Sequence, residues 1–276
     1  MIQEKTTMML PKEKADITPS SFMGDEKGIY FTFRSDMGVI SSIVPEPLET
    51  AFPLVSGYIV NIDKPGFSEP YREAMLGVYV KFKDKIGMYP VSFLLSGPGA
   101  EMATYLGREK SGLSKKMCEQ ENCIRVIREG DVFRGMVERK GVLLMDVSLK
   151  LGEYNNPGTG AIYNDPEPGK ITGGMSYYFQ TSLLPDENGI SHFAKVNMLE
   201  NEAEYTYRKW EPGKVTVRLQ SGKDDAWGMF PVFENMGGAY SENDLLMKEQ
   251  FVAANPNPEN VMEKLLVNRF DKLALL

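Results

Sequence analysis

Long runs of β-branched, aromatic and alternating residues fill most of this chain and constrain its fold more than any other feature. Up to the middle of the chain these runs cover residues 28–33, 51–63, 71–82, 88–96, 124–128, 132–139 and 142–151. Later ones lie near Met175, Phe193, Tyr205 and Val215, and over residues 230–240. A period of two bounded by Gly, Pro, Asn and Asp is typical of strands. The pattern predicts a β-rich barrel or sandwich with a few peripheral helices.

Three segments have helical spacing instead. We expect a short helix that begins at Asp36 and ends before Pro45, a second helix over residues 98–106, and an amphipathic third over residues 260–276. The stretch 155–174 is rich in Asn, Pro and Gly and predicts a long loop. A loop of that length in a compact domain is often a binding rim or a lid.

Neither a repeat nor a linker rich in Pro, Ser or Gly divides the chain, so we predict one main domain over residues 25–250. Residues 1–24 are polar and lack a period, which predicts a flexible N-terminal arm. Residues 251–276 are expected to form a C-terminal helical extension that packs on the same domain.

Composition excludes several classes of partner. The 276 residues carry a formal net charge of −7 and no basic block, which argues against a general nucleic-acid or anionic-membrane binder. No apolar run approaches the ~20 residues that cross a bilayer, and residues 1–11 hold no apolar core of signal-peptide length. The two cysteines, Cys118 and Cys123, fit free thiols in a reducing cytoplasm. We therefore expect a soluble, cytoplasmic protein with a small-molecule ligand and no nucleic-acid or membrane partner.

The chain has a single histidine, His192. Nucleophile systems of the Ser-His-Asp and Cys-His type, and most zinc catalysts, depend on one or more histidines. His192 lies in a strand-like segment, where a structural role is the default interpretation. We predict no metal site, and any catalysis must come from Lys, Glu, Arg and Tyr.

Lys115 and Lys116 end a loop that contains Gly and Ser, at residues 107–116. Paired lysines are most often surface charge. A lysine with the ordinary pKa of about 10.4 is almost wholly protonated near neutrality and cannot attack a carbonyl. Desolvation and a nearby cation both favour the neutral amine, and two adjacent lysines at an apolar wall can supply both. The pair is therefore a candidate for nucleophilic chemistry.

Four short segments, in order along the chain, are similar to the motifs of one family. Residues 33–36 are FRSD, 44–49 are VPEPLE, 71–73 are YRE and 107–116 are GREKSGLSKK. They resemble the Y-R-T-D, V-P-E-P-L-E, Y-x-E and G-R-E-x-S-x-x-P-K-K segments of the acetoacetate decarboxylase family. The resemblance extends over roughly residues 29–247.

The resemblance implies which residues form the site. Lys115 corresponds to the Schiff-base lysine, which in acetoacetate decarboxylase is an established case of activation by a neighbouring cation, and Lys116 corresponds to that cation. Glu73 corresponds to the glutamate that faces the lysine, and we expect it to shuttle protons. Two positions depart from the family. Tyr58 stands where decarboxylases carry an active-site glutamate, and Lys27 lies near the place of an arginine.

Four further residues are predicted to hold the substrate or the lysine loop. Tyr58 is expected to donate its hydroxyl in place of the missing carboxylate. Arg34, Arg108 and Glu109 are candidates for holding the loop or a substrate carboxylate, and a structural salt bridge fits these three equally well.

The resemblance also implies a barrel or cone-like sheet with a funnel to a buried lysine, a homo-oligomer, and chemistry without a metal or organic cofactor. Neutral Lys115 attacks the ketone of a small keto acid, and the imine accepts the electron pair released when a β-carboxylate leaves as CO2. We therefore predict a carbon–carbon lyase that decarboxylates a β-keto acid. Two alternatives stay open. One is a Schiff-base aldolase or dehydratase on an α-keto acid, which the altered residues favour somewhat, and the other is a non-catalytic barrel that binds a small acidic ligand.

Overall fold

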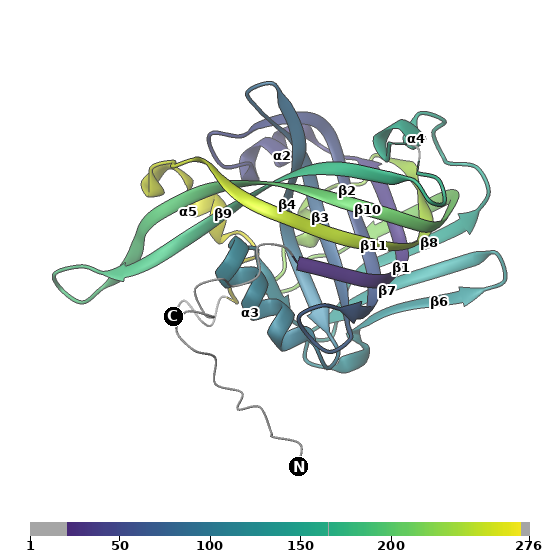
Figure 1. Ribbon diagram of the computed structural model, residues 1–276, viewed down its shortest axis with the longest axis horizontal. Helices are drawn as coiled ribbons and strands as arrows, with labels where there is room; N and C mark the ends of the chain where they lie inside the picture. The colour runs from purple at the N-terminus through teal and green to yellow at the C-terminus, as the bar shows by residue number, and fades with distance from the viewer. Residues whose placement is uncertain (1–20, 165, 272–276) are drawn as a thin grey trace, which may run out of the picture.

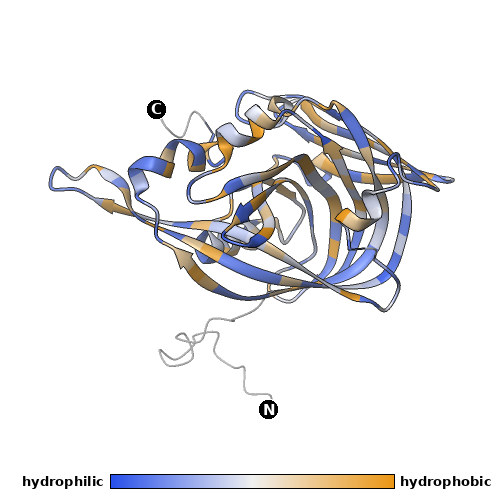
Figure 2. Ribbon diagram, turned by 90° about the horizontal axis from the view of Figure 1, so that it is seen from above, coloured by the Kyte–Doolittle hydropathy of each residue, from blue (hydrophilic) through white to orange (hydrophobic). Residues whose placement is uncertain are grey.

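Seven strands form a closed ring in the computed structural model, which describes residues 21–164 and 166–271 (Figure 1). The first four pair antiparallel in sequence order, and they are β1 (Ser21–Arg34), β2 (Glu49–Pro65), β3 (Tyr71–Phe82) and β4 (Lys85–Ser96). The other three are β9 (Ile171–Pro185), β10 (Ser191–Leu219) and β11 (Glu234–Ala254). β11 returns to pair with β1, and β4 meets β9 through the pair Met88 and Ser176. Seen from above, the strands curve around one interior (Figure 2).

The ring strands bury both of their faces. Phe31, Ile59 and Leu76 point to one side and join the main core. Their neighbours Tyr30 and Val60 point to the other side, where a second apolar cluster draws residues from β1 to β4, β10 and β11 and lines the interior of the ring. Because successive side chains of a strand alternate between faces, burial on both sides produces near-continuous apolar runs.

A further antiparallel part of the sheet covers the outer face. It consists of β6 (Ile124–Glu129), β7 (Val132–Arg139) and β8 (Val142–Leu151). β8 pairs with the end of β10, from Gly213 to Leu219, so this long strand belongs to both parts of the sheet. Gly135 of β7 lies against the side chain of Ile59, since a Cβ there would be 2.6 Å from its Cδ1. The main core fills the space between the two parts.

The helices are few and peripheral. They are α2 (Met37–Ile43), α3 (Ala100–Ser111), α4 (Thr159–Ile162) and α5 (Pro258–Leu266), with short 3-10 turns η1 (Glu121–Cys123) and η2 (Trp227–Met229). Asp36 caps α2 by accepting the backbone N–H of Val39 at 2.9 Å, as its position before the apolar residues predicts. None of the helices in the described residues is both long and apolar enough to span a membrane.

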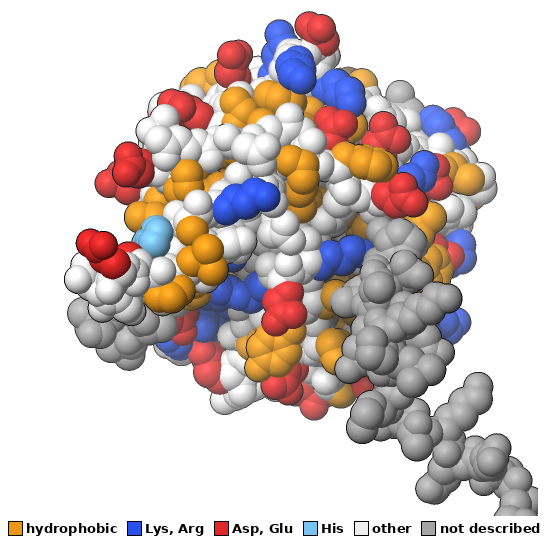
Figure 3. All heavy atoms as spheres, turned by 60° about the vertical axis from the view of Figure 1, so that its left-hand side comes forward, with side chains coloured by type: hydrophobic (Ala, Val, Ile, Leu, Met, Phe, Trp, Pro, Cys, Tyr) orange, Lys and Arg blue, Asp and Glu red, His pale blue; other side chains and the backbone are white. Residues whose placement is uncertain are grey.

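The β9–β10 hairpin extends beyond the ring (Figure 1). Leu183, Leu184 and Ile190 near its tip are each more than half exposed, at 54%, 54% and 65%. Figure 3 looks onto this side of the molecule and shows apolar side chains among the charged ones. Exposed apolar surface of this kind is typical of a contact with another protein. The homo-oligomer implied by the family resemblance stays a prediction.

The β-rich fold with a few peripheral helices is confirmed, but several boundaries differ from those predicted. Residues 21–24 belong to β1 rather than to the arm, because they pair with β11 on one side and β2 on the other. Residues 107–111 continue α3 instead of starting a loop. Residues 251–254 extend β11, where pairing with β10 overrides the helical expectation. The predicted arm at 1–20 and the tail at 272–276 lie outside the described residues.

Candidate active site

The segment after α3 delivers the lysine pair to the edge of β4. α3 ends at Ser111 and is capped by Gly112, whose φ of 70° lies in the left-handed region that glycine tolerates. A Cβ at Gly112 would lie 2.1 Å from the carbonyl oxygen of Phe179, so this turn has no room for a side chain. The chain continues as β5 (Lys115–Met117), parallel to β4, with Lys115 opposite Phe93. This register turns Lys115 toward the interior of the ring.

Lys115, Glu73 and Tyr58 form a continuous set of buried contacts. Nζ of Lys115 lies 2.7 Å from Oε2 of Glu73, and the Tyr58 hydroxyl donates to Oε1 of Glu73 at 2.6 Å. The side chains of Lys115 and Glu73 are only 7% and 3% exposed. Burial, aided by the charge of Glu73, raises the pKa of Tyr58 well above its usual value, so this phenol stays a hydrogen-bond donor. Three of the residues predicted from the sequence thus meet in one place.

The rest of the interior is mainly apolar and aromatic. The centroid of the Phe93 ring lies 5.2 Å from Nζ of Lys115. Gly107 leaves space for the lysine stem, since a Cβ there would lie 2.7 Å from Cδ of Lys115. The Tyr71 hydroxyl is buried without a hydrogen-bond partner among the described residues. Other side chains of this cluster are Tyr30, Val60, Ile62, Met75, Leu95, Tyr205 and Leu245.

A second buried carboxyl, Glu26, faces the same interior and is absent from the residues predicted from the sequence. The Tyr30 hydroxyl donates to Oε1 of Glu26, and Nδ2 of Asn243 donates to the same oxygen at 3.2 Å. Ser241 in turn donates to Oδ1 of Asn243 at 2.7 Å, which fixes the orientation of the amide. Glu26 is 2% exposed, and burial raises its pKa to about 7. A large fraction of this carboxyl therefore holds a proton at neutral pH.

Replacing Glu26 by glutamine should change how stability depends on pH. The pKa of this carboxyl is about 7 in the folded chain, against an ordinary value of 4.5. Between these two pH values the unfolded chain binds fewer protons than the folded one, so the free energy of unfolding falls as pH rises through the window. At about 1.36 kcal/mol for each pH unit, the wild-type protein loses roughly 3 kcal/mol that Glu26→Gln does not lose. Urea unfolding at pH 4.5 and pH 8 measures this difference, and an equal pH dependence of the two proteins would contradict the assignment.

Lys116 points to the opposite face of β5. Its Nζ lies 2.6 Å from Oδ1 of Asp225, and Arg139 contacts the other oxygen of Asp225 at 2.9 Å. Arg139 also pairs with Asp271 at 2.9 Å, and this pairing holds the pKa of Asp271 well below its usual range. We call this set of ion pairs the Asp225 network, and its members are Lys116, Arg139, Lys140, Asp224, Asp225 and Asp271. Any catalytic effect of Lys116 on Lys115 must act through space, and this role stays a prediction.

The three other predicted residues lie away from the interior. Arg34 is exposed and pairs with Glu234 at 3.1 Å. Glu109 is exposed on α3. Arg108 donates from Nη1 to the backbone carbonyl of Lys115 at 3.0 Å, which fits the predicted role of holding the lysine segment.

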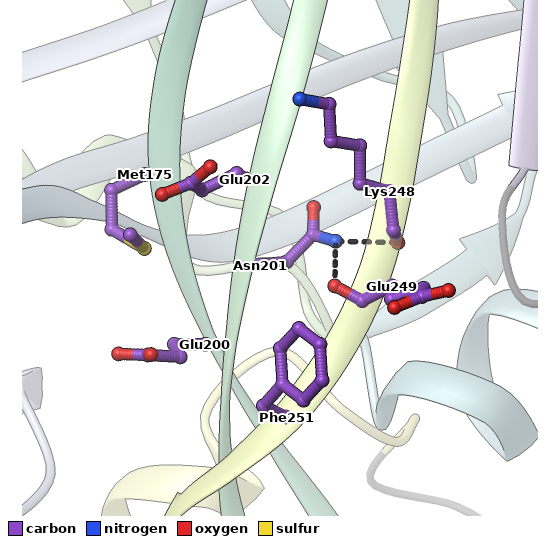
Figure 4. Close-up of a pocket in the computed structure, with 7 residues that line it drawn as sticks. All are labelled: Met175, Glu200, Asn201, Glu202, Lys248, Glu249 and Phe251. Atoms are coloured by element: carbon purple, nitrogen blue, oxygen red, sulfur yellow. Dashed lines mark hydrogen bonds between the residues drawn. The ribbon is translucent and has the colours of Figure 1, made fainter.

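A separate hollow of about 420 Å³ lies over β9, β10 and β11 (Figure 4). Asn201 crosses its floor and donates to the carbonyl oxygens of Lys248 and Glu249 at 2.7 and 3.1 Å. Its lining residues are Met175, Glu200, Asn201, Glu202, Lys248, Glu249 and Phe251. It contains none of the catalytic or substrate-binding residues predicted from the sequence, so the candidate site remains the interior around Lys115. Within residues 21–164 and 166–271, no group of His, Cys, Asp and Glu has the arrangement of a metal site.

Known proteins share both sequence and fold with this chain. A family model described as acetoacetate decarboxylase (ADC) matches residues 6–255. The CLA biosynthesis isomerase of Lactiplantibacillus plantarum is 33% identical over 253 residues, which cover 91% of this chain and 89% of that protein. A solved acetoacetate decarboxylase superposes with a TM-score of 0.71 at 17% identity, covering 87% of this chain and 91% of that one. The acetoacetate decarboxylase of Legionella pneumophila gives a TM-score of 0.69 at 15% identity, covering 91% and 94%. The solved structures support the fold alone at these identities.

Proposed function

The chain belongs to the acetoacetate decarboxylase family, whose members are enzymes, and from that premise we propose that Lys115 forms an imine with an uncharged ketone and that the enzyme then relocates a proton on this ketone. The observation that carries the proposal is the buried contact of 2.7 Å between Nζ of Lys115 and Oε2 of Glu73. Imine formation requires an amine that becomes a nucleophile and a base that takes its proton, and these two groups lie in contact.

The charges of the interior favour a ketone that carries no carboxylate beside it. Two buried carboxyls, Glu26 and Glu73, face the interior, and among the buried cations of the described chain only Lys115 contacts either of them, through its ion pair with Glu73. Lys27, near the place of the family arginine, pairs with Asp63 at 3.2 Å instead. A substrate carboxylate would lie in an apolar surrounding beside the Glu73 carboxylate, without a bidentate cationic partner. A ketone with an apolar chain would gain contact with the aromatic wall.

The mechanism begins with proton transfer from Lys115 to Glu73, which leaves a neutral amine. The amine attacks the carbonyl carbon, and the carbinolamine oxygen leaves as water after it takes the proton from Glu73. The product is a protonated imine, which withdraws electrons from the neighbouring carbon. When the ketone carries a β,γ double bond, the Glu73 carboxylate then removes a proton from the α carbon, and the C–H electron pair forms a dienamine. Protonation at the γ carbon and hydrolysis release the α,β-unsaturated ketone and free Lys115.

Two outcomes share this imine. Proton relocation agrees with the relative that is named an isomerase and is 33% identical over most of both chains. Decarboxylation of a β-keto acid, the outcome predicted from the sequence, is the second candidate, and the description of the matching family model favours it. In that case the imine accepts the electron pair of the bond to CO2, and Glu73 supplies the proton that replaces the carboxylate.

Borohydride trapping tests the imine. The protein is incubated separately with methyl hexyl ketone, acetoacetate and pyruvate, reduced with sodium borohydride, digested and mapped by mass spectrometry. We expect methyl hexyl ketone to leave a reduced adduct on Lys115, and Lys115→Ala to leave none. Lys214→Ala, which removes an exposed lysine of β10, serves as the matched control and should keep the adduct.

Other results of the same experiment would change the proposal. If no ketone leaves an adduct on the folded protein, imine chemistry is contradicted and a ligand-binding barrel is favoured. If acetoacetate gives the adduct and releases CO2 while methyl hexyl ketone does not react, decarboxylation replaces proton relocation.

A further inference from the structure

Two carboxyl–phenol pairs lie side by side in the interior. On β1, the Tyr30 hydroxyl donates to Glu26, and across β2 and β3 the Tyr58 hydroxyl donates to Glu73. Tyr30 and Tyr58 are directly opposite each other in the β1–β2 register, with ring centroids 5.6 Å apart. Glu26 and Glu73 therefore approach the interior from the two strands that flank β2. The mechanism above uses Glu73 and leaves Glu26 without a role.

We propose that Glu26 is the acid that delivers the second proton, to the distal carbon of an unsaturated ketone bound as an imine to Lys115. This inference rests on the proposed function and adds a second proton-transfer residue to it. A ketone that lies over Tyr58 and Val60 of β2 has Glu73 on one side and Glu26 on the other. One carboxylate removes a proton while the other carboxyl supplies one.

The contacts of Glu26 suit an acid rather than a structural ion. Tyr30 and Asn243 both donate to Oε1, so the proton of the neutral carboxyl resides on Oε2. A buried carboxylate that served only structure would normally have a cation beside it, whereas the contacts of Glu26 are to a phenol and an amide. A pKa near the working pH is the condition for efficient proton transfer, and burial raises the pKa of Glu26 to about 7.

The surroundings of Glu26 contain further groups that titrate or carry charge. They face it from β1, β2, β3, β10 and β11, and they are Tyr30, Tyr58, Tyr71, Glu73, Tyr205, Tyr207 and Asp244. Burial raises the pKa of the tyrosines above 10, so they stay neutral at the pH of the reaction. The charges of Glu73 and Asp244 both disfavour the Glu26 anion and help to keep it protonated.

The step balances in protons and electrons. With a β,γ-unsaturated ketone, the Glu73 carboxylate takes a proton from the α carbon of the imine, and the electrons form a neutral dienamine. The γ carbon of the dienamine takes the proton of Glu26, the double bond moves to the α,β position, and the protonated imine is restored. Glu73 then holds a proton and Glu26 a charge. Exchange of one proton with water at each carboxyl returns the site to its first state.

The test uses the β,γ-isomer of octenone as the probe and the whole 276-residue chain with three variants. The variants are Glu26→Gln, Tyr30→Phe and, as control, Glu101→Gln. The control removes an exposed carboxylate that, like Glu26, accepts a hydrogen bond from a tyrosine four residues later in the chain. The absorbance of the conjugated product gives the rate against pH. Deuterium incorporation at the α carbon in heavy water and borohydride trapping on Lys115 report the earlier steps.

With Glu26→Gln we expect borohydride to trap the adduct, and the α hydrogens to exchange, at wild-type rates. The conjugated product should form roughly 100-fold more slowly. The wild-type rate should fall as pH rises through about 7. This falling limb of the pH–rate profile should be absent in Glu26→Gln. Since the Tyr30 hydrogen bond lowers the pKa of Glu26, Tyr30→Phe should move the limb to higher pH, which a purely structural role would not do. Glu101→Gln should match the wild type.

Three outcomes would overturn the inference, and they can be told apart. A Glu26→Gln protein that forms conjugated product within threefold of the wild-type rate, with an unchanged pH profile, removes Glu26 from the reaction and leaves the imine proposal intact. A wild-type protein that forms no adduct removes both. If Glu26→Gln does not fold, Tyr30→Phe decides on its own: a falling limb at the same pH as in the wild type overturns the inference.

Discussion

Glu73→Gln should slow the isomerisation of a β,γ-unsaturated ketone roughly 100- to 10,000-fold while borohydride still traps the imine on Lys115. Glutamine keeps the size of the side chain and accepts the Tyr58 hydrogen bond, but it cannot take a proton from carbon. The imine still forms, more slowly, because water can take the proton of Lys115 and return it to the carbinolamine oxygen, the two transfers that Glu73 makes in the wild-type protein. The rate of conjugation and the yield of the adduct measure the two effects separately.

The same variant separates proton relocation from decarboxylation. Loss of CO2 from an imine breaks a C–C bond without a base, so a decarboxylase needs Glu73 only to return a proton, a task that water can share. We therefore expect a much smaller loss for acetoacetate than for the unsaturated ketone. Tyr58→Phe removes one hydrogen bond to Glu73 and should cost about tenfold or less in either reaction. Equal losses in Glu73→Gln for both substrates would contradict this division of roles.

The residues of the lysine site could be predicted because they belong to local motifs. Lys115 and Glu73 each lie in a short segment of defined sequence, and strand alternation then determines which side of β5 and β3 they face. Tyr58 stands where the family pattern has a glutamate, and its hydroxyl donates a hydrogen bond to Glu73.

Glu26 had only a weak signal in the sequence. It stands between Asp25 and Lys27, which is typical of a surface turn, and a register shift lies between Met23 and Glu26 in the β1–β11 pairing. Its partner Asn243 is 217 residues away, and only closure of the ring brings the two together. The available clue is the two-residue period of this segment, which places Glu26 on the same face of a strand as Tyr30.

Long-range ion pairs were equally hidden from sequence analysis. The prediction treated Lys116 as a cation next to Lys115, but adjacent residues of a strand point to opposite faces. Its partner Asp225 lies in an acidic pair that is typical of a solvated turn, yet Asp224 and Asp225 are both buried. Their burial depends on ion pairs with Arg139 and Lys140, which lie far away along the chain and which no local pattern connects to them.

Asp225→Asn should lower the free energy of unfolding by about 3–5 kcal/mol. The side chains of Lys116, Arg139 and Asp225 are 6%, 5% and 2% exposed, so the substitution leaves a buried positive charge without its counter-charge. Asp146→Asn is the matched control, because it breaks a bidentate pair with Arg134, whose side chain is 55% exposed, and should cost at most about 1 kcal/mol. Urea unfolding of the two variants measures the contrast, and a cost for Asp225→Asn no larger than the control would contradict it.

A double variant that keeps the charge balance of the Asp225 network should recover the lost stability. Asp225→Asn combined with Lys116→Met removes one anion and one cation from the Asp225 network, so most of the lost stability should return. The double variant also isolates the chemical role of Lys116, because β5 stays paired with β4 and Lys115 stays opposite Phe93. If the adduct on Lys115 forms at the wild-type rate, Lys116 anchors the strand and does not activate its neighbour. If the double variant is folded but forms the adduct at least tenfold more slowly, the charge of Lys116 acts across β5 as the family resemblance implies.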